Sequence, residues 1–271
     1  MHATDATALH TVALCMVGLL GLAVGSFLNV VVHRVPLRLS VVTPGSHCPA
    51  CDAPVKPRHN VPLLGWLVLR GRCADCRAPI SVRYPLVEGG TAALFVLVTL
   101  RLGLTPLLPA WLYLTAVAVA LALIDLDVQR LPDVIVGPSY LVGLALLTPA
   151  VVAADDWGAA VRGLVGMAVL GVSYLALVLV RPGAMGLGDV KLAGLLGLYL
   201  GVLGWSSLVV GGFGAFLLGG VAGAVLLALR RAGRGSAVPF GPFMLGATLL
   251  ALFVAGPISS WYLGLLHPAT A

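Results

Sequence analysis

Eight apolar segments dominate this sequence, and we expect each to cross a lipid bilayer as a helix. Spanning the hydrocarbon core takes about 20 apolar residues. Hydrophobic residues make up 60% of the 271 residues and charged residues only 10%, against roughly 25% charged residues in soluble domains. The composition therefore excludes a soluble enzyme and a disordered chain, and it predicts an all-α polytopic membrane protein. The expected spans are 9–32, 85–103, 108–127, 133–153, 158–180, 190–205, 206–229 and 238–265.

The distribution of Lys and Arg predicts the orientation of these helices. The first segment lacks a basic stretch before it and is too long for a signal peptide, so we expect a retained helix with an extracytoplasmic N-terminus. Only Arg101 and Arg162 then fall outside the cytoplasm, which agrees with the preference of basic residues for cytoplasmic loops. Topology thus explains the net charge of +6, and no nucleic-acid partner is expected. The expected cytoplasmic set is Arg34, Arg38, Lys56, Arg58, Arg70, Arg72, Arg77, Arg83, Arg130, Arg181, Lys191, Arg230, Arg231 and Arg234.

One long polar segment, residues 34–83, interrupts the apolar pattern and carries two Cys-x-x-Cys pairs. Two such pairs can surround a zinc ion with four sulfur atoms at about 2.3 Å. A segment with few large apolar side chains also needs such a link to fold. We therefore expect residues 34–83 to form a cytoplasmic zinc-ribbon-like domain between a first helix at 1–33 and a seven-helix membrane domain at 84–271. The expected ligands are Cys48, Cys51, Cys73 and Cys76.

Other assignments for this segment are less favoured. Two disulfides would use the same four cysteines, but disulfides are rare in a reducing compartment. His47 and His59 could bind metal, yet four thiolates already complete a closed, non-catalytic shell. Cys15 lies inside the first span and is expected to be a packing residue.

The acidic residues are informative because there are only ten of them and charge inside a membrane is costly. We expect Glu88 to lie in the first turn of the second span, where it would suit the helix dipole, with a local structural role favoured over a catalytic one. Asp133 follows Pro132 at the start of another helix, and capping explains it in the same way. Asp125 lies in the last turn of an otherwise apolar helix and has no such explanation. Asp127, which follows two positions later, faces another side of that helix.

Asp189 ends a Gly-x-Gly-Asp motif, Gly186 to Asp189, and Lys191 follows it at the head of the sixth span. Asp125 and Asp189 are both expected at the cytoplasmic ends of their helices, so close packing of those helices would bring the two carboxyl groups together. Two close carboxyl groups share a proton, and such a pair can activate water and polarise an amide carbonyl. The helix dipoles would favour the proton on Asp125 and leave Asp189 as the base. This pattern indicates an intramembrane aspartyl protease.

Two other classes of protein remain open at this point. A zinc-ribbon scaffold would need the cysteines but not the aspartates. A small-solute transporter would use buried acids, although those usually lie near the membrane midplane.

Small residues in the sixth and seventh spans are expected to serve helix packing rather than a substrate groove. They are Gly194, Gly197, Gly201, Ala215, Gly219 and Gly223.

Six ordered motifs over nearly the whole chain give it a family resemblance. The sequence resembles the bacterial prepilin peptidases, or type IV leader peptidases, which belong to the GxGD intramembrane aspartyl proteases. Many of these relatives have histidine where this chain has Val128, a departure outside the aspartate pair. The motifs are Gly25 to Arg34, the double Cys-x-x-Cys segment, Arg83 to Glu88, Asp125 to Asp133, Gly186 to Leu192, and Pro239 to Phe243.

The resemblance implies a function at the inner membrane. It implies cleavage of the basic leader of type IV prepilins and type II secretion pseudopilins after glycine, at the cytoplasmic face, with Asp125 and Asp189 catalytic. The four-cysteine segment accompanies relatives that also methylate the new N-terminus with S-adenosylmethionine, so we expect both activities. The residues that bind this cofactor are not evident. Archaeal preflagellin peptidases share the aspartates but not the cysteine segment and are a weaker match.

Overall fold

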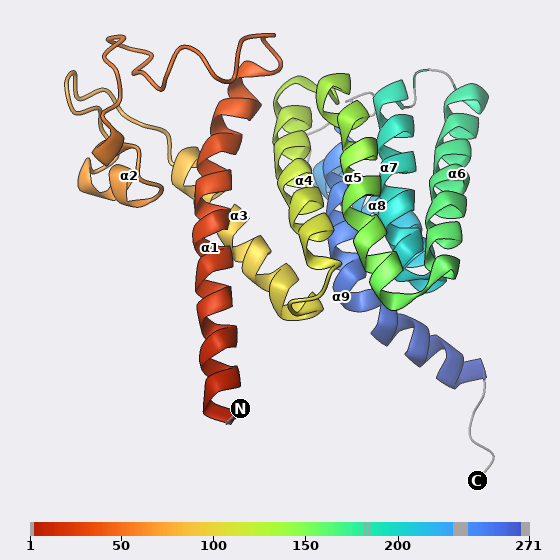
Figure 1. Cartoon of the computed structure of the whole chain (residues 1–271). Helices are drawn as coiled ribbons and strands as arrows, with labels where there is room; N and C mark the ends of the chain where they lie inside the picture. The colour runs from red at the N-terminus through yellow and green to blue at the C-terminus, as the bar shows by residue number, and fades with distance from the viewer. Residues whose placement is uncertain (1–2, 182, 184, 230–237, 267–271) are drawn as a thin grey trace. The chain divides into compact units, whose positions relative to one another are not determined.

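The computed structural model describes residues 3–181, 183, 185–229 and 238–266. Helices make up all the regular secondary structure of this part of the chain, which confirms the predicted all-α fold. Three expected cytoplasmic arginines, Arg230, Arg231 and Arg234, lie outside the described residues. The elements are α1 (Ala3–Arg34), the 3-10 helix η1 (Pro57–His59), α2 (Leu64–Val68), α3 (Arg83–Leu102), α4 (Leu108–Val128), α5 (Asp133–Ala154), α6 (Trp157–Val180), α7 (Leu187–Leu203), α8 (Trp205–Ala228) and α9 (Gly241–Leu266) (Figure 1).

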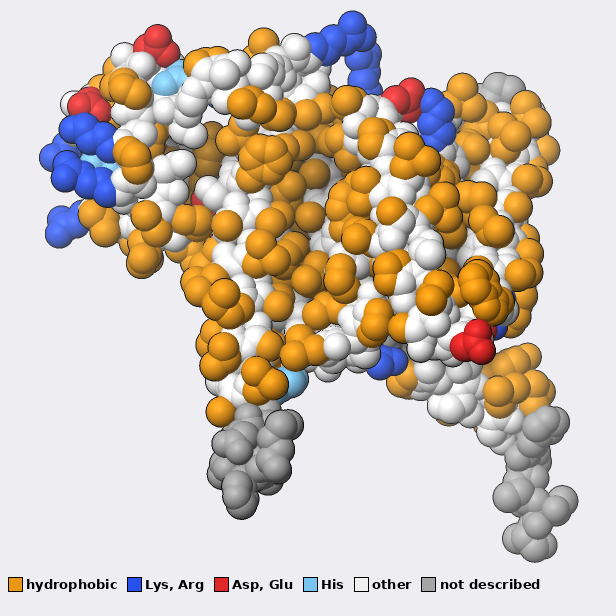
Figure 2. All heavy atoms as spheres, in the orientation of Figure 1, with side chains coloured by type: hydrophobic (Ala, Val, Ile, Leu, Met, Phe, Trp, Pro, Cys, Tyr) orange, Lys and Arg blue, Asp and Glu red, His pale blue; other side chains and the backbone are white. Residues whose placement is uncertain are grey.

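Seven of these helices are long and apolar enough to cross a membrane: α1, α3, α4, α5, α6, α8 and α9. Orange apolar side chains cover most of the helical surface on the side seen in Figure 2. Leu141 on α5, Val180 on α6 and Phe213 on α8 are 73%, 84% and 68% exposed. Apolar surface of this extent is stable in a bilayer and not in water. The chain is therefore a multi-pass membrane protein.

The eighth long helix, α7, is the exception, because it has only 17 residues. The sequence predicts this span at 190–205, and the structure places it at Leu187–Leu203. Every residue from Leu192 to Gly201 is buried, and α7 packs against α5, α6, α8 and α9. A helix that is apolar on all sides belongs in the interior of a bundle. The neighbouring helices, more than its length, therefore determine that α7 is an interior helix of the bundle.

Glycines allow α6 and α7 to pack with their backbones in contact. These helices share the most extensive interface of the bundle (Figure 1). A Cβ atom on Gly197 would lie 2.2 Å from the carbonyl oxygen of Gly166, and one on Gly201 would lie 2.3 Å from that of Arg162. The expected packing role is therefore confirmed for these two glycines. It is wrong for Gly223, where a Cβ atom would meet open space.

The chain divides into two compact units, Met1–Leu104 with Trp111–Ala120, and Thr105–Ala110 with Leu121–Ala271. In the first unit α1 packs along α3, again through glycine. A Cβ atom on Gly21 would lie 2.6 Å from Cα of Ala92, and one on Gly25 would lie 2.7 Å from Cα of Glu88. By these contacts α3 belongs to the same compact unit as α1. The expected domain boundaries at residues 33 and 83 stay a prediction.

The structure corrects the expected role of Glu88. Because α3 begins at Arg83, Glu88 lies beyond the first turn. Its side chain is buried, and Oε2 accepts a hydrogen bond of 2.7 Å from the backbone N–H of Leu63. Glu88 therefore ties α3 to the cysteine-rich segment, which is a structural role by a mechanism other than the helix dipole.

We expect Gly197→Ala to destabilise the bundle. The new methyl group would overlap the backbone of α6, and overpacking of this kind costs about 1–3 kcal/mol. The melting temperature in detergent should fall accordingly. Gly171→Ala is the matched control on α6, because its Cβ atom would lie 3.8 Å from the nearest neighbour, Cα of Gly194. Equal melting temperatures for the two variants would contradict this account of the interface.

Candidate active site and candidate metal centre

The four cysteines of the polar segment come together as the sequence predicts. Their sulfur atoms all lie within 4.8 Å of one another, and Sγ of Cys48 is 3.8 Å from Sγ of Cys76. Four sulfurs each about 2.3 Å from a tetrahedral zinc ion lie about 3.8 Å apart. The donor set and its spacing therefore fit a closed four-thiolate site.

Two equivalent turns present these sulfurs. A repeated pattern in the sequence marks both turns, and the sequence analysis above did not use it. Residues 48–55 and 73–80 share the pattern Cys-x-x-Cys-x-Ala-Pro-Val/Ile. The fifth position of each has positive φ, Asp52 at 59° and Arg77 at 62°. The repeat could have predicted two copies of one metal-binding turn. The matching contacts are Cys48 N–H to Ala53 O (2.9 Å) and Cys73 N–H to Ala78 O (2.8 Å), with bridges between His47 and Pro54 and between Arg72 and Pro79.

The electrostatics of the four sulfurs also fit a cation. Backbone N–H groups of Cys76 and Asp75 lower the pKa of Cys73 to about 7. The backbone N–H of Ala53 lowers the pKa of Cys51, but contacts with the other three sulfurs, together with burial, outweigh it and raise that pKa to about 12. The cluster therefore retains protons by itself, and a divalent metal would displace them.

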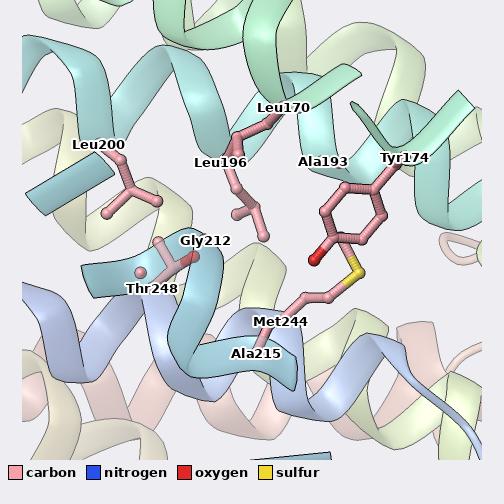
Figure 3. Close-up of a pocket in the computed structure, with 10 residues that line it drawn as sticks. Leu170, Tyr174, Ala193, Leu196, Leu200, Gly212, Ala215, Met244 and Thr248 are labelled. Carbon is pink, nitrogen blue, oxygen red and sulfur yellow. The ribbon is translucent and has the colours of Figure 1, made fainter. Parts of the chain in front are cut away.

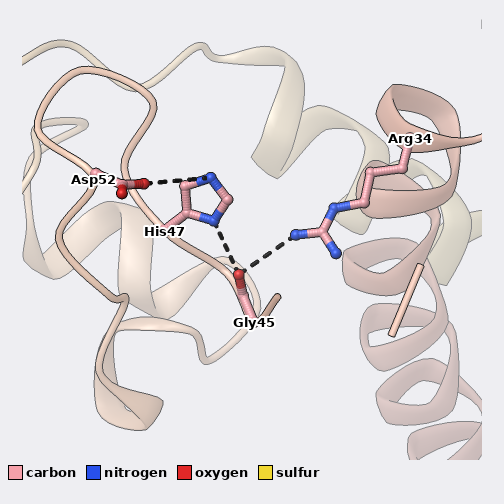
Figure 4. Close-up of polar contacts among 4 residues, drawn as sticks. All are labelled: Arg34, Gly45, His47 and Asp52. Atoms are coloured by element: carbon pink, nitrogen blue, oxygen red, sulfur yellow. Dashed lines mark hydrogen bonds and ion pairs between the residues drawn. The ribbon is translucent and has the colours of Figure 1, made fainter. Parts of the chain in front are cut away.

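The histidines of this segment lie outside the sulfur cluster. Nδ1–H of His47 donates to Gly45 O (3.0 Å), and Nε2 of the same ring lies 3.7 Å from Oδ1 of Asp52, as Figure 4 shows. Arg34, at the end of α1, donates to Ser40 O (3.0 Å) and to Gly45 O (3.4 Å). These contacts attach the cysteine-rich segment to α1, so the structure assigns His47 a structural role. Cys15 lies on α1, away from the cluster.

In the second unit, Asp189 is the third residue of α7 and helps to cap it. Its Oδ2 accepts a hydrogen bond of 3.0 Å from the backbone N–H of Gly186, and its own N–H donates to Gly186 O. This is the carboxylate half of a capping box, which satisfies an N–H group that no helical carbonyl reaches. The sequence analysis did not anticipate this local role for Asp189.

Asp125 lies in the last turn of α4, as expected, and its side chain is only 5% exposed. Its Oδ2 accepts a hydrogen bond of 3.0 Å from the backbone N–H of Gly241, the first residue of α9. The helix-dipole argument from the sequence considered only the C-terminal end of α4 and not the N-terminus of α9. Since both aspartates contact a helix N-terminus, that argument no longer distinguishes which of them holds a shared proton.

Leu131, in the linker between α4 and α5, lies against residues that neighbour each of the two aspartates. A Cβ atom on Gly188 would lie 3.1 Å from Cβ of Leu131, and one on Gly241 would lie 3.3 Å from Cδ2 of the same leucine. Leu131 thus separates the first turns of α7 and α9. Gly241, which donates to Asp125, and Gly188, which precedes Asp189, thus both lie against Leu131. Among the described residues α4 and α7 share no extensive interface of their own, so the catalytic pairing of Asp125 with Asp189 stays a prediction.

Supporting residues at this end of the bundle form an ion pair. Nζ of Lys191 lies 2.8 Å from both carboxylate oxygens of Asp133. The hydroxyl of Tyr140 on α5 donates to the backbone carbonyl of Lys191, so α5 is joined twice to the start of α7. Capping alone therefore does not explain Asp133, since it also pairs with Lys191. Asp127 is exposed.

Aromatic side chains of α6 and α8 pack against Phe240, the residue before α9. Tyr174 of α6 is 2% exposed. Its ring centroid lies 5.3 Å from that of Phe216 and 6.3 Å from that of Phe240. Tyr174 and Met244 also project into a narrow, mostly apolar pocket between α6, α7, α8 and α9 (Figure 3). The sequence analysis did not identify this cluster, because its members are far apart along the chain.

Comparisons with known proteins agree with this architecture. Residues 19–102 match the Bacterial Peptidase A24 N-terminal domain, and residues 112–228 match the Type IV leader peptidase family. A prepilin leader peptidase/N-methyltransferase of Aeromonas hydrophila is 38% identical, over 92% of this chain and 93% of that relative. One of the same name from Pseudomonas aeruginosa is 37% identical, over 97% and 98%. No solved structure matches. The chain therefore belongs to the type IV leader peptidase family and is a membrane enzyme of that family.

Proposed function

We propose that this protein is a prepilin leader peptidase that uses Asp125 and Asp189 as its catalytic pair. The observation that supports the proposal is that each carboxyl group accepts a backbone N–H at the start of a helix, while Leu131 lies against the Gly241 and Gly188 positions beside them. The relatives of this chain are named prepilin leader peptidase/N-methyltransferase. The substrates would be type IV prepilins and type II secretion pseudopilins. Their basic leader would be removed after glycine at the cytoplasmic face of the inner membrane.

The chemistry follows from two carboxyl groups that share one proton. The ionised member takes a proton from a water molecule, which attacks the scissile carbonyl carbon. The protonated member donates a hydrogen bond to the carbonyl oxygen and later helps to protonate the leaving amine. The pair titrates as a unit, and either aspartate can serve as the base. Backbone N–H groups of Gly186 and Gly241 hold one oxygen of each carboxyl group during this sequence.

The proposed orientation places the active site and the cysteine-rich segment in the cytoplasm and the N-terminus outside. The positive-inside distribution of Lys and Arg supports it. Asp125, Asp133 and Asp189 belong to the end of the second unit that this orientation makes cytoplasmic. Asp156 and Arg162, which pair at 3.0 Å before and within α6, belong to the opposite end. A substrate with an apolar helix after its cleavage site would then enter sideways from the bilayer.

Two cofactors belong to the proposal. Zinc would be held by Cys48, Cys51, Cys73 and Cys76 in a closed structural site, for which the sulfur spacing is suitable. S-adenosylmethionine would supply the methyl group for N-methylation of the cleaved pilin. That second activity rests on the name of the relatives. No contact among the described residues assigns the methyl donor to a site.

We expect Asp125→Asn and Asp189→Asn each to lower prepilin cleavage by about a thousandfold or more, because an amide can neither accept nor release the required proton. Purified variants would be incubated with a prepilin and S-adenosylmethionine, and the product weighed by mass spectrometry. Asp155→Asn, at the exposed end of α5, should cleave like the unaltered protein. Cleavage retained in either active-site variant would exclude the aspartate pair as the catalytic residues. Leader loss without a methyl group would remove the methyltransferase claim.

We also expect about one zinc ion per chain in the purified protein, and close to none in Cys73→Ser. Metal content would be measured by elemental mass spectrometry after exhaustive dialysis. Cys15→Ser is the matched control, because Cys15 lies in α1 outside the sulfur cluster. Zinc bound equally by both variants would exclude the four-thiolate site. Zinc-free protein with Cys15 as its single titratable thiol would indicate two disulfides instead.

A further inference from the structure

The segment from Pro239 to Phe243 contacts a buried aspartate through its backbone, at the N–H of Gly241. We propose that the first turn of α9 positions Asp125 for catalysis, with Gly241 as the positioning residue and Phe240 as its anchor. The proposal rests on the proposed function of the aspartate pair. It assigns to this segment a task in catalysis rather than in packing alone.

The first support is the hydrogen bond itself. Gly241 begins α9, so its N–H has no carbonyl partner within the helix. In a membrane protein such a group must find a partner in the protein or in water. Here the partner is Oδ2 of Asp125, at 3.0 Å and largely shielded from solvent. A carboxylate that satisfies a buried N–H is fixed in direction, because rotation away would leave both groups unpaired.

The second support is the space around Gly241. A Cβ atom there would lie 2.7 Å from Oδ2 and 3.3 Å from Cγ of Asp125, and 3.3 Å from Cδ2 of Leu131. Any residue with a side chain would therefore push the carboxyl group away from its place. Leu131 also contacts the Gly188 position just before Asp189, so it offers little room to yield. The position of the Asp125 side chain on α4 therefore requires glycine at position 241.

The third support is the anchoring of the turn by Phe240. Its ring lies 5.3 Å from that of Phe216 on α8 and 6.3 Å from that of Tyr174 on α6. Gly219 makes space for it, since a Cβ atom there would lie 2.9 Å from Cε2 of Phe240. The residue next to Gly241 is therefore packed between two other helices. This packing fixes the N–H of Gly241 relative to the bundle.

The test measures prepilin cleavage kinetics of Gly241→Ala. Displacement of a catalytic group by a fraction of an ångström to about 1 Å can cost up to about a hundredfold in rate. We expect kcat to fall by about tenfold or more while KM stays within about twofold, because Asp125 acts on the reacting bond and not on the substrate helix. Gly246→Ala, in the same helix, places its methyl group in open space and should keep the original kcat. Unchanged kcat in Gly241→Ala would overturn the proposal.

A stability cycle tests the contact without relying on activity. Gly241→Ala should lower the melting temperature in detergent through its clash with the Asp125 carboxyl group. In an Asp125→Ala background the clash is absent, so the same substitution should lower the melting temperature by about half as much or less. Equal effects in both backgrounds would show that Gly241 acts independently of Asp125, and the proposal would fail.

The two hypotheses fail in different ways. If Asp125→Asn still cleaves prepilin, the proposed aspartate pair is wrong, and the positioning role falls with it. If Asp125→Asn is inactive while Gly241→Ala retains its kcat, only the positioning role is wrong. A low kcat for Gly241→Ala, an unchanged KM and a background-dependent loss of stability together support it.

Discussion

Unpaired backbone N–H groups at two helix N-termini are the constraint on which the candidate active site depends. In a membrane protein each such group needs an acceptor in the protein or in water. At α7 the acceptor is Asp189, three residues after the N-cap, and at α9 it is Asp125 from a different helix. Each carboxyl group is thus held by the helix end that it satisfies. The same contacts that complete the bundle also aim the two groups that hydrolysis would require.

Helix boundaries could be predicted well because they depend on local chemistry. Apolar length alone places most helix ends within a few residues, since the bilayer sets that length. The prediction was weaker at α7, whose 17 residues are defined by the helices around it. It was also wrong about the mechanism at Glu88, whose partner is the N–H of Leu63. A composition argument identifies a costly buried charge but not the group that compensates it.

The site could be predicted only in part, for a related reason. The sequence marks Asp125 and Asp189 because each is an acid at the end of an apolar helix. It contains no sign that Gly241, more than a hundred residues after Asp125, would donate to it. Contacts of this kind follow from how α9 packs, through Phe240, against α6 and α8. The two metal-binding turns are the opposite case, because their pattern is local and is repeated in the sequence.

Three helices and one linker therefore share the task of placing two carboxyl groups. α4 and α7 supply the aspartates, α9 supplies an N–H group, and Leu131 fills the space between the last two. The glycines at 188 and 241 follow from this crowding, because a methyl group at either position would meet Leu131 or Asp125. A site built this way depends on the relative position of several helix ends. It can be lost through a single added methyl group while every charged residue remains in place.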